Sequence, residues 1–249
     1  MSRLPHTDLI PDSLPPLALV CGDPARADRV ADFLAQAKRV ANKREYRTYC
    51  GFYDGVEMAV CSHGIGAPGA AIAFEELAAA GAKTIIRAGT CGSLQQTVHE
   101  GDIVVVTGAV QWTGYGREVV PSGFPAIAHL DVVWQLKQSA ANGKRPFHTG
   151  LVLTRDAFYE GIATTQTPNY ETMAQANVLA VEMECAALFL FGTVRGVRTG
   201  AVLAVDGYVF DHKQQMAHFK PTRPIVAEAV DAEIEVALKA LAALHHDDF

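Results

Sequence analysis

The sequence predicts a single α/β domain that spans residues 1–249. The chain has 249 residues, of which 49% are hydrophobic, and this is enough for one large core. Short apolar runs of strand length alternate with longer segments that carry apolar residues at helical spacing. Several of these runs are apolar at every position, which is typical of strands in a sheet that helices cover on both faces. We therefore expect a central sheet between layers of helices.

The elements can be assigned in chain order. A strand at 17–20 leads into a helix that begins at Asp23 and Pro24, because aspartate suits the N-cap and proline the first helical position. Strands at 46–53 and 56–61 are joined by a turn at 54–55. The later elements are an alanine-rich helix to about residue 80, strands at 84–88 and 102–110, a helix at 129–141, a strand at 149–153, a helix at 184–194, a strand at 199–205 and a helix at 224–243. Residues 207–223 are the least regular stretch, and we expect a flap there.

Charge and cysteine content exclude several classes of protein. A net charge of −6 and a pI of about 5.8 do not suit a nucleic-acid-binding protein. The five cysteines form no Cys-x-x-Cys pair and no Cys/His cluster, so no metal site is predicted. Their odd number and scattered positions fit reduced thiols. The sequence has neither a signal segment nor an apolar run long enough to cross a membrane. We expect a cytoplasmic protein.

Two segments at predicted strand ends suit anion binding. Ligands in α/β folds gather at the carboxyl ends of strands. Residues 21–26 (Cys-Gly-Asp-Pro-Ala-Arg) join a glycine, which lets the backbone approach a ligand, to a helix N-terminus and Arg26. The alternative is a capped helix with a surface arginine. Residues 86–92 (Ile-Arg-Ala-Gly-Thr-Cys-Gly) put Arg87 at the end of a buried strand, where it needs either a bound anion or an internal carboxylate.

Two acidic segments complete the set. In residues 181–184 (Val-Glu-Met-Glu), Glu184 suits hydrogen bonds from a sugar diol, and the alternative is a helix N-terminus that favours acids. In residues 205–207 (Val-Asp-Gly), Asp206 ends an apolar strand, and a partly desolvated carboxyl group has a raised pKa that suits a general acid. The alternative is an ordinary turn aspartate. Each segment alone leaves both interpretations open.

In this order, the four segments resemble the branch of the nucleoside phosphorylases that contains bacterial purine nucleoside phosphorylase and uridine phosphorylase. The resemblance rests on Gly-Asp-Pro-x-Arg at 22–26, Arg-x-Gly-Thr-Cys-Gly at 87–92 and Glu-Met-Glu at 182–184, and it extends over nearly the whole chain. It implies a mixed sheet bent into a distorted barrel and flanked by helices. It also implies a homo-oligomer, a hexamer built as a trimer of dimers, with active sites at the dimer interfaces.

The resemblance assigns the site residues by ligand. The expected phosphate ligands are Gly22, Arg26, Arg87, Thr90 and a neighbouring subunit's Arg44. The expected ribose ligands are Met183, Glu184 and His6, which crosses the interface. The expected base-site residues are Cys91, Gly92, Phe158, Glu182 and Asp206. In the implied reaction, phosphate cleaves the ribosyl–base bond of a nucleoside, with Arg87 and Asp206 as the catalytic residues. Phosphate is a co-substrate, and no metal or redox cofactor is implied beyond a monovalent cation near Glu45.

The residues that bear on base preference match two different branches of the family. Cys91 and Asp206 match the purine branch. No arginine follows residues 158–161, where uridine phosphorylases carry a Gln-x-Arg pair, and a site without those donors should bind uracil poorly. Against this, residues 44–45, residues 64–68 and Thr90 look more like the uridine branch. We predict purine nucleosides in preference to uridine.

Two further points stay open at this stage. The arginine that supports the aspartate in the purine branch corresponds to Phe219 here, with Lys220 and Arg223 nearby, so the donor that supports Asp206 is undecided. A nucleoside hydrolase of the methylthioadenosine/adenosylhomocysteine type and a non-catalytic nucleoside-binding protein are the rival classes. Since a hydrolase uses water, it does not need the three phosphate-binding arginines.

Overall fold

The structure is a computed structural model that describes residues 2–159, 161–210 and 223–247. Within these ranges the chain forms ten strands and seven helices. The strands are β1 (Leu17–Cys21), β2 (Ala35–Lys43), β3 (Tyr46–Tyr53), β4 (Val56–Ser62), β5 (Thr84–Ser93), β6 (Ile103–Trp112), β7 (Ala126–Ile127), β8 (Phe147–Arg155), β9 (Ala180–Glu182) and β10 (Arg198–Tyr208). The helices are α1 (Pro24–Ala31), α2 (Ala67–Ala79), α3 (Gly114–Val119), α4 (Leu130–Ala141), α5 (Tyr170–Gln175), α6 (Cys185–Arg195) and α7 (Pro224–Asp247).

The strands form one mixed sheet that closes partly on itself. Across the described residues the order is β10-β6-β8-β9-β5, and β10 pairs again with β5, so these five strands make a closed barrel. From β5 the sheet continues outward through β1, β4, β3 and β2. Parallel pairs such as β1–β5 occur together with antiparallel pairs such as β10–β6. The predicted mixed sheet with a distorted barrel is therefore confirmed.

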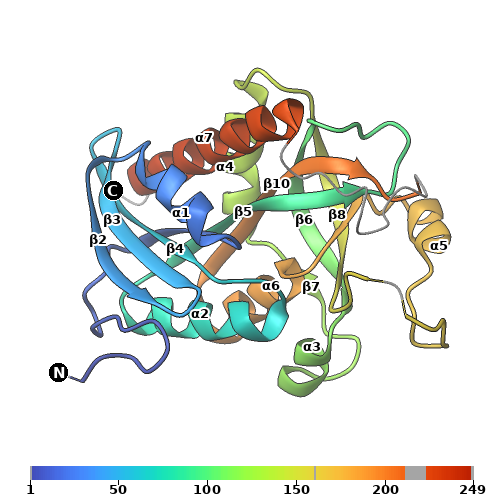
Figure 1. The fold of residues 1–249 in the computed structure, drawn as a ribbon, viewed down its shortest axis with the longest axis horizontal. Helices are drawn as coiled ribbons and strands as arrows, with labels where there is room; N and C mark the ends of the chain where they lie inside the picture. Colours follow the sequence, from blue (N-terminus) through green and yellow to red (C-terminus); the bar gives the residue numbers. More distant parts are fainter. Residues whose placement is uncertain (1, 160, 211–222, 248–249) are drawn as a thin grey trace.

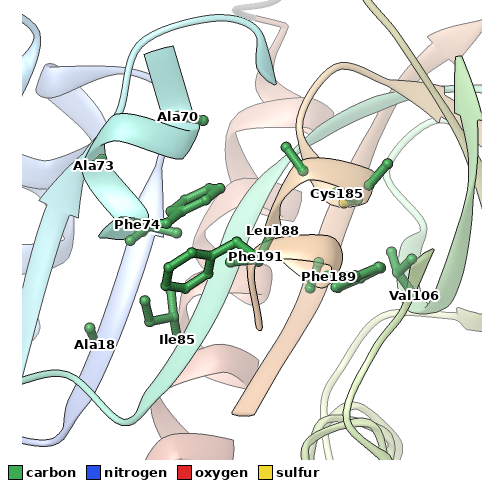
Figure 2. Packing of buried hydrophobic residues seen from close by; sticks show 14 of the residues in the cluster. Ala18, Ala70, Ala73, Phe74, Ile85, Val106, Cys185, Leu188, Phe189 and Phe191 are labelled. Atoms are coloured by element: carbon green, nitrogen blue, oxygen red, sulfur yellow. The ribbon is translucent and has the colours of Figure 1, made fainter. Parts of the chain in front are cut away.

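Helices cover the sheet on two sides, and each side has its own apolar core. Helices α2 and α6 pack on one side, and α1, α4 and α7 on the other (Figure 1). Figure 2 shows the first core, in which the rings of Phe74 on α2 and Phe191 on α6 lie 5.8 Å apart. Burying one such side chain contributes roughly 1.5–3 kcal/mol. These contacts fix α2 against α6.

The main departures from the predicted elements are β2 and β9. Strand β2 has only Ala41 buried among its nine residues, so it has no apolar pattern and is held by pairing with β3. Strand β9 is three residues long, too short for a period to be recognised. Strand β5 extends five residues beyond its predicted end at Ala88, because β10 and β9 pair with the extension.

The flap expected at 207–223 is only partly covered. Residues 207–210 and Arg223 are described, and Tyr208 ends strand β10. Phe219 and Lys220 lie outside the described residues. In the part of the chain that is described, no helix has both the length and the apolar character needed to span a bilayer.

Candidate active site

Four parallel strands, β4, β1, β5 and β10, lie next to one another, and their carboxyl ends meet at one edge of the sheet. Residues 63–64 follow β4, Gly22 follows β1, Thr90 lies near the end of β5, and Asp206 lies near the end of β10. The backbone nitrogen of Gly64 donates a 2.9 Å hydrogen bond to the carbonyl of Gly22, which joins two of these ends. Three of these ends belong to segments that the sequence marked as candidates (21–26, 86–92 and 205–207), and these segments are thus neighbours in space.

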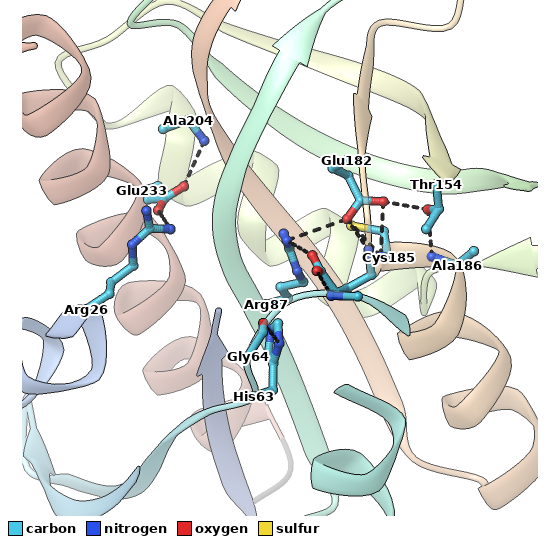
Figure 3. Close-up of polar contacts among 12 residues, drawn as sticks. Arg26, His63, Gly64, Arg87, Thr154, Glu182, Cys185, Ala186, Ala204 and Glu233 are labelled. Carbon is cyan, nitrogen blue, oxygen red and sulfur yellow. Dashed lines mark hydrogen bonds and ion pairs between the residues drawn. The ribbon is translucent and has the colours of Figure 1, made fainter. Parts of the chain in front are cut away.

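Arg87 is the central cation of this edge. It is buried on β5, and its Nη2 contacts both Glu184, in a short ion pair, and Glu182, at 3.6 Å (Figure 3). Burial lowers the pKa of Arg87, but the neighbouring acidic groups, of which Glu184 is the strongest, together outweigh burial and raise it. Its Nε and Nη1 atoms are buried and donate to no atom of the described residues. Two unsatisfied, positively charged donors in a dry site are suited to a bound anion.

The two glutamates beside Arg87 have different roles in the fold. Glu182 accepts hydrogen bonds from the backbone nitrogens of Glu184 (2.8 Å) and Cys185 (2.9 Å) and from the Thr154 hydroxyl, so it caps the start of α6. Glu184 instead accepts a 2.6 Å bond from the backbone nitrogen of Gly66, in addition to its ion pair with Arg87. The helix-terminus interpretation therefore applies to Glu182, and the internal ion-pair interpretation applies to Arg87 and Glu184.

The same arrangement sets the charge of the two carboxylates. Burial raises the pKa of Glu182 despite the opposing effect of Arg87. For Glu184 burial is the largest influence and also acts upward, but the charge of Arg87 and the hydrogen bonds from Arg87 and the Gly66 backbone together lower the pKa. Glu184 is thus the ionised partner of Arg87. Because the oxygens of Glu182 are engaged by its own chain, its expected contact with a base stays a prediction.

Asp206 projects from a β-bulge. Opposite β5, Val205 pairs with Cys91 and Gly207 pairs with Gly92, so Asp206 is the extra residue between two register positions. Bulges of this kind re-aim a side chain out of the regular ladder. Burial raises the pKa of Asp206 to about 7, although a hydrogen bond from Thr90 opposes the shift. An Asp with such a pKa can carry a proton near neutral pH.

Arg223 is the described cation next to Asp206. Its Nη2 donates a 2.7 Å hydrogen bond to the Asp206 carbonyl, and its Nη1 forms a 2.9 Å ion pair with Glu100. The charge of Arg223 also opposes the raised pKa of Asp206. Of the two basic residues that the sequence left as possible supports for Asp206, Lys220 lies outside the described residues, and Arg223 donates to the Asp206 backbone carbonyl.

The segment after β1 is both a helix cap and part of the charged edge. Asp23 caps α1, and its Oδ1 accepts a 2.8 Å bond from Ala25. Arg26, two residues into α1, points its Nη1 to Oε1 of Glu233 at 3.2 Å. Glu233 is fully buried on α7 (Figure 3). Sequence reasoning missed Glu233, although it interrupts the apolar face of α7 between Val230 and Ala237, and that interruption was a usable signal.

His63 is a second residue to which the sequence gave no role. Its ring is fully buried, its Nδ1 lies 2.9 Å from the Gly64 carbonyl, and its Nε2 has no partner among the described residues. Burial lowers the pKa of His63 to about 4, so the imidazole is neutral at pH 7. Since Nδ1 then carries the proton, Nε2 is an acceptor at the edge of the charged cluster.

Two predicted residues lie away from the cluster. Arg44 occupies the exposed two-residue turn between β2 and β3, at a φ of 54°, and makes no described ion pair with the cluster. The nitrogens of His6 lie against Glu76 of α2, with the backbone nitrogen 3.0 Å and Nδ1 2.7 Å from Oε1. Both residues were expected to act in a neighbouring subunit, so contacts with their own site are not required of them.

The remaining predicted residues surround the end of β5. Cys91 is buried and Gly92 pairs with β9, so both lie directly beside Asp206 and Glu182. Met183 is partly buried between the two glutamates. Phe158 is half exposed in the segment after β8, where its ring meets that of Tyr159 edge-on at 5.1 Å.

The fold and the site together define an α/β barrel enzyme whose sheet edge presents a buried arginine, an ionised glutamate and an aspartate with a pKa near neutrality. The model of the phosphorylase superfamily matches residues 16–245, and the chain belongs to that superfamily.

The reported matches to similar proteins cover 81–99% of this chain. Guanosine phosphorylase from Halorubrum lacusprofundi is 36% identical over 98% of this chain and 100% of its own length. Uridine phosphorylase from Treponema pallidum is 38% identical over 81% of this chain and 81% of its own. The crystal structure of purine nucleoside phosphorylase from Toxoplasma gondii superimposes with a TM-score of 0.91 at 35% identity, covering 99% of this chain and 98% of that one. The resemblance inferred from the motifs is confirmed.

Proposed function

We propose that the protein is a nucleoside phosphorylase that cleaves the N-glycosidic bond of purine nucleosides with inorganic phosphate, releasing the free base and ribose 1-phosphate. The proposal rests on the position of three groups at one edge of the sheet. On β5, Arg87 offers two unsatisfied, buried donors beside the ionised Glu184, and on the adjoining β10 a bulge presents Asp206, whose pKa of about 7 suits a proton donor. An anion site, a diol acceptor and a general acid are the three groups that phosphorolysis of a purine nucleoside needs.

The phosphate is held, in this proposal, by the edge of β1 and β5. The backbone of Gly22, the Thr90 hydroxyl and the guanidinium groups of Arg26 and Arg87 supply donors to its oxygens. Arg44 of the neighbouring subunit completes the set. Its exposure on a tight turn is compatible with reaching across an interface.

The nucleoside lies above the phosphate. The carboxylate of Glu184 accepts hydrogen bonds from the ribose 2′- and 3′-hydroxyls, Met183 packs on the sugar, and a neighbouring subunit's His6 reaches the 5′-hydroxyl. The expected base contacts are Cys91, Gly92, Phe158, Glu182 and Asp206.

The reaction follows from these positions. The bond between C1′ and the base nitrogen lengthens, positive charge develops on the sugar ring, and the phosphate dianion stabilises that charge before one of its oxygens bonds to C1′. The electron pair of the broken bond stays with the base, and Asp206 gives its proton to N7 of the purine. Arg223, which holds the Asp206 backbone, supports the acid.

The choice of purine has a specific basis and a specific rival. Asp206 is a suitable acid for N7, and relatives named guanosine phosphorylase and purine nucleoside phosphorylase support a purine substrate. Uridine is the second candidate, because a relative named uridine phosphorylase is similarly close, at 38% identity.

The proposal also covers the oligomeric state, the cellular compartment and a bound cation. We propose a homohexamer arranged as a trimer of dimers, since the roles given to His6 and Arg44 require a second subunit. The five cysteines all fall within the described residues and carry free thiols, which suits the reducing cytoplasm. No cofactor is proposed apart from a monovalent cation near Glu45, whose side chain packs against Gly64.

A cleavage panel tests the proposal. Inosine, guanosine, adenosine, uridine and thymidine would each be incubated with the protein, with and without phosphate, and the free base and pentose 1-phosphate would be quantified. We expect phosphate-dependent cleavage of the purine nucleosides. Cleavage of uridine alone would select the second candidate, and full activity without phosphate would replace the phosphorylase with a hydrolase.

A further inference from the structure

Glu233 is a buried carboxylate that ties three elements together behind the proposed phosphate site. It projects from α7 with an exposed fraction of 0%. Its Oε1 pairs with Nη1 of Arg26 on α1 at 3.2 Å, and its Oε2 accepts a 2.7 Å hydrogen bond from the backbone nitrogen of Ala204 on β10. Figure 3 shows this bridge on the far side of β5 from Arg87. Ala204 lies two residues before Asp206, which we propose as the general acid.

The surroundings of Glu233 contain few groups that could balance its charge. The cations that act on it are Arg26 and the more distant Arg87, and the neighbouring acid is Asp206. The thiols of Cys21 and Cys91 also feel its charge, and burial raises the pKa of both, so they stay neutral. The face of α4 that packs against α7 is apolar and consists of Val132, Leu136 and Ala140.

Arg26 therefore has two competing partners. In the free protein it neutralises Glu233, and a buried carboxylate without such a partner is strongly disfavoured. In the proposed enzyme Arg26 also faces a phosphate dianion. The dianion attracts the same guanidinium and repels the Glu233 carboxylate, so binding weakens the stabilisation of the charged form of Glu233. A buried acid in that position takes up a proton.

We propose that Glu233 is a positioning residue that couples phosphate binding to the uptake of one proton in alkaline solution: there the ionised carboxylate holds Arg26 in the empty site and becomes a neutral carboxylic acid when Arg26 turns its charge to the phosphate. The proton comes from solvent and ends on a Glu233 oxygen, and no electrons are transferred. The proton keeps the hydrogen bonds of Glu233 while removing the negative charge behind the phosphate. This inference rests on the proposed function, because that function makes Arg26 a phosphate ligand.

The titration behaviour of the empty site agrees with the geometry. Burial raises the pKa of Glu233 to about 8, and Arg26 is the largest opposing influence. A bound dianion must raise this pKa further. Above about pH 8, Glu233 is ionised in the free protein and protonated in the phosphate complex. Phosphate binding therefore takes up a proton, and the affinity for phosphate falls as pH rises.

Calorimetry of phosphate binding counts the proton directly. Inorganic phosphate would be titrated into the intact protein at about pH 9 in two buffers of different ionisation enthalpy, where phosphate is already a dianion and Asp206 is already ionised. We expect the wild type to take up about one proton per site. In Glu233→Gln, which keeps a hydrogen-bonding side chain without the charge, we expect almost none. The matched control is Glu235→Gln, an exposed acid on the same helix that pairs with Lys239, and it should behave as the wild type.

The pH dependence of affinity gives a second readout that a purely structural role would not change. Between about pH 8 and pH 9.5, the phosphate Kd of the wild type should rise by up to about tenfold per pH unit, whereas that of Glu233→Gln should change by less than about twofold. Asp206→Asn should keep the wild-type slope.

The outcomes separate this inference from the proposed function. Phosphate binding by the wild type without proton uptake overturns the role of Glu233 and leaves the phosphorylase proposal standing. An unchanged slope in Glu233→Gln overturns it as well. Failure of the wild type to bind phosphate at any pH overturns both. If Glu233→Gln does not fold, the proton count of the wild type against Asp206→Asn still decides, since uptake that disappears in Asp206→Asn assigns the proton to the other acid.

Discussion

The guanidinium of Arg87 lies directly over Gly89, in space that a Cβ atom at position 89 would occupy. We therefore expect Gly89→Ala to displace the Arg87 side chain and disturb its pair with Glu184. If Arg87 holds phosphate, kcat/KM for phosphate should fall about 10–100-fold, because catalytic donors are sensitive to small displacements. The measurement is steady-state kinetics at varied phosphate concentration.

Gly114→Ala is the matched control for this change. The nearest atom that a Cβ at position 114 would meet is Oδ2 of Asp156 at 3.7 Å, an ordinary contact. This variant should keep the phosphate KM of the wild type. Equal phosphate KM values in Gly89→Ala and the wild type would remove Arg87 from the phosphate site.

Asp206→Asn should lower purine phosphorolysis by about 10²–10⁴-fold, the usual contribution of a general acid. Burial raises the pKa of Asp206 to about 7, so its protonated, proton-donating form is present below that pH and is lost as pH rises through it. The wild-type kcat should accordingly decline above about pH 7. The pH profile of kcat for inosine or guanosine measures this, and the decline should be absent in the variant.

A substrate with a better leaving group tests the same role chemically. A 7-methylpurine nucleoside already carries a positive charge on its base, so the base leaves without a proton at N7. Asp206→Asn should therefore cleave it nearly as fast as the wild type does. An equally large loss on this substrate would mean that Asp206 acts in binding and not as the acid.

Arg223→Gln should reduce kcat for purine nucleosides about tenfold, the effect of losing one hydrogen bond that positions a catalytic group. Because Arg223 holds the Asp206 carbonyl and pairs with a partly exposed Glu100, the free energy of unfolding should change by less than about 1 kcal/mol. Kinetics and urea denaturation of the variant measure both quantities. If Arg223→Gln instead raises the KM for phosphate and leaves kcat unchanged, Arg223 does not support Asp206.

Arg44 and Arg87 test whether one site contains residues from two subunits. Arg44→Ala and Arg87→Ala should each be nearly inactive alone. When the two variants are unfolded, mixed equally and refolded, half of the dimers are mixed and each of these has one complete site. About a quarter of the wild-type activity should therefore return. No recovery, with mixed oligomers demonstrated by mass spectrometry, would rule out a shared site.

The sequence by itself determined the alternation of strands and helices, because buried parallel strands and amphipathic helices leave clear periodic patterns. Its motifs also marked Arg87 and Asp206 as candidates, since an arginine or a carboxylate at the end of an apolar strand is costly without a partner, and Glu184 as a candidate just before an apolar helix. Strand β2 could not be predicted from the sequence, because only Ala41 is buried in it and its residues therefore show no apolar period.

Only the tertiary structure decided how these groups pair. The sequence could not choose between a helix cap and a sugar ligand for the two glutamates, and the folded chain gives Glu182 to the start of α6 and Glu184 to Arg87. The sequence also could not predict that Glu233 pairs with Arg26, which lies 207 residues away in the chain. Partner choice among buried charges depends on distances set by the packing of whole elements, and no local pattern encodes those distances.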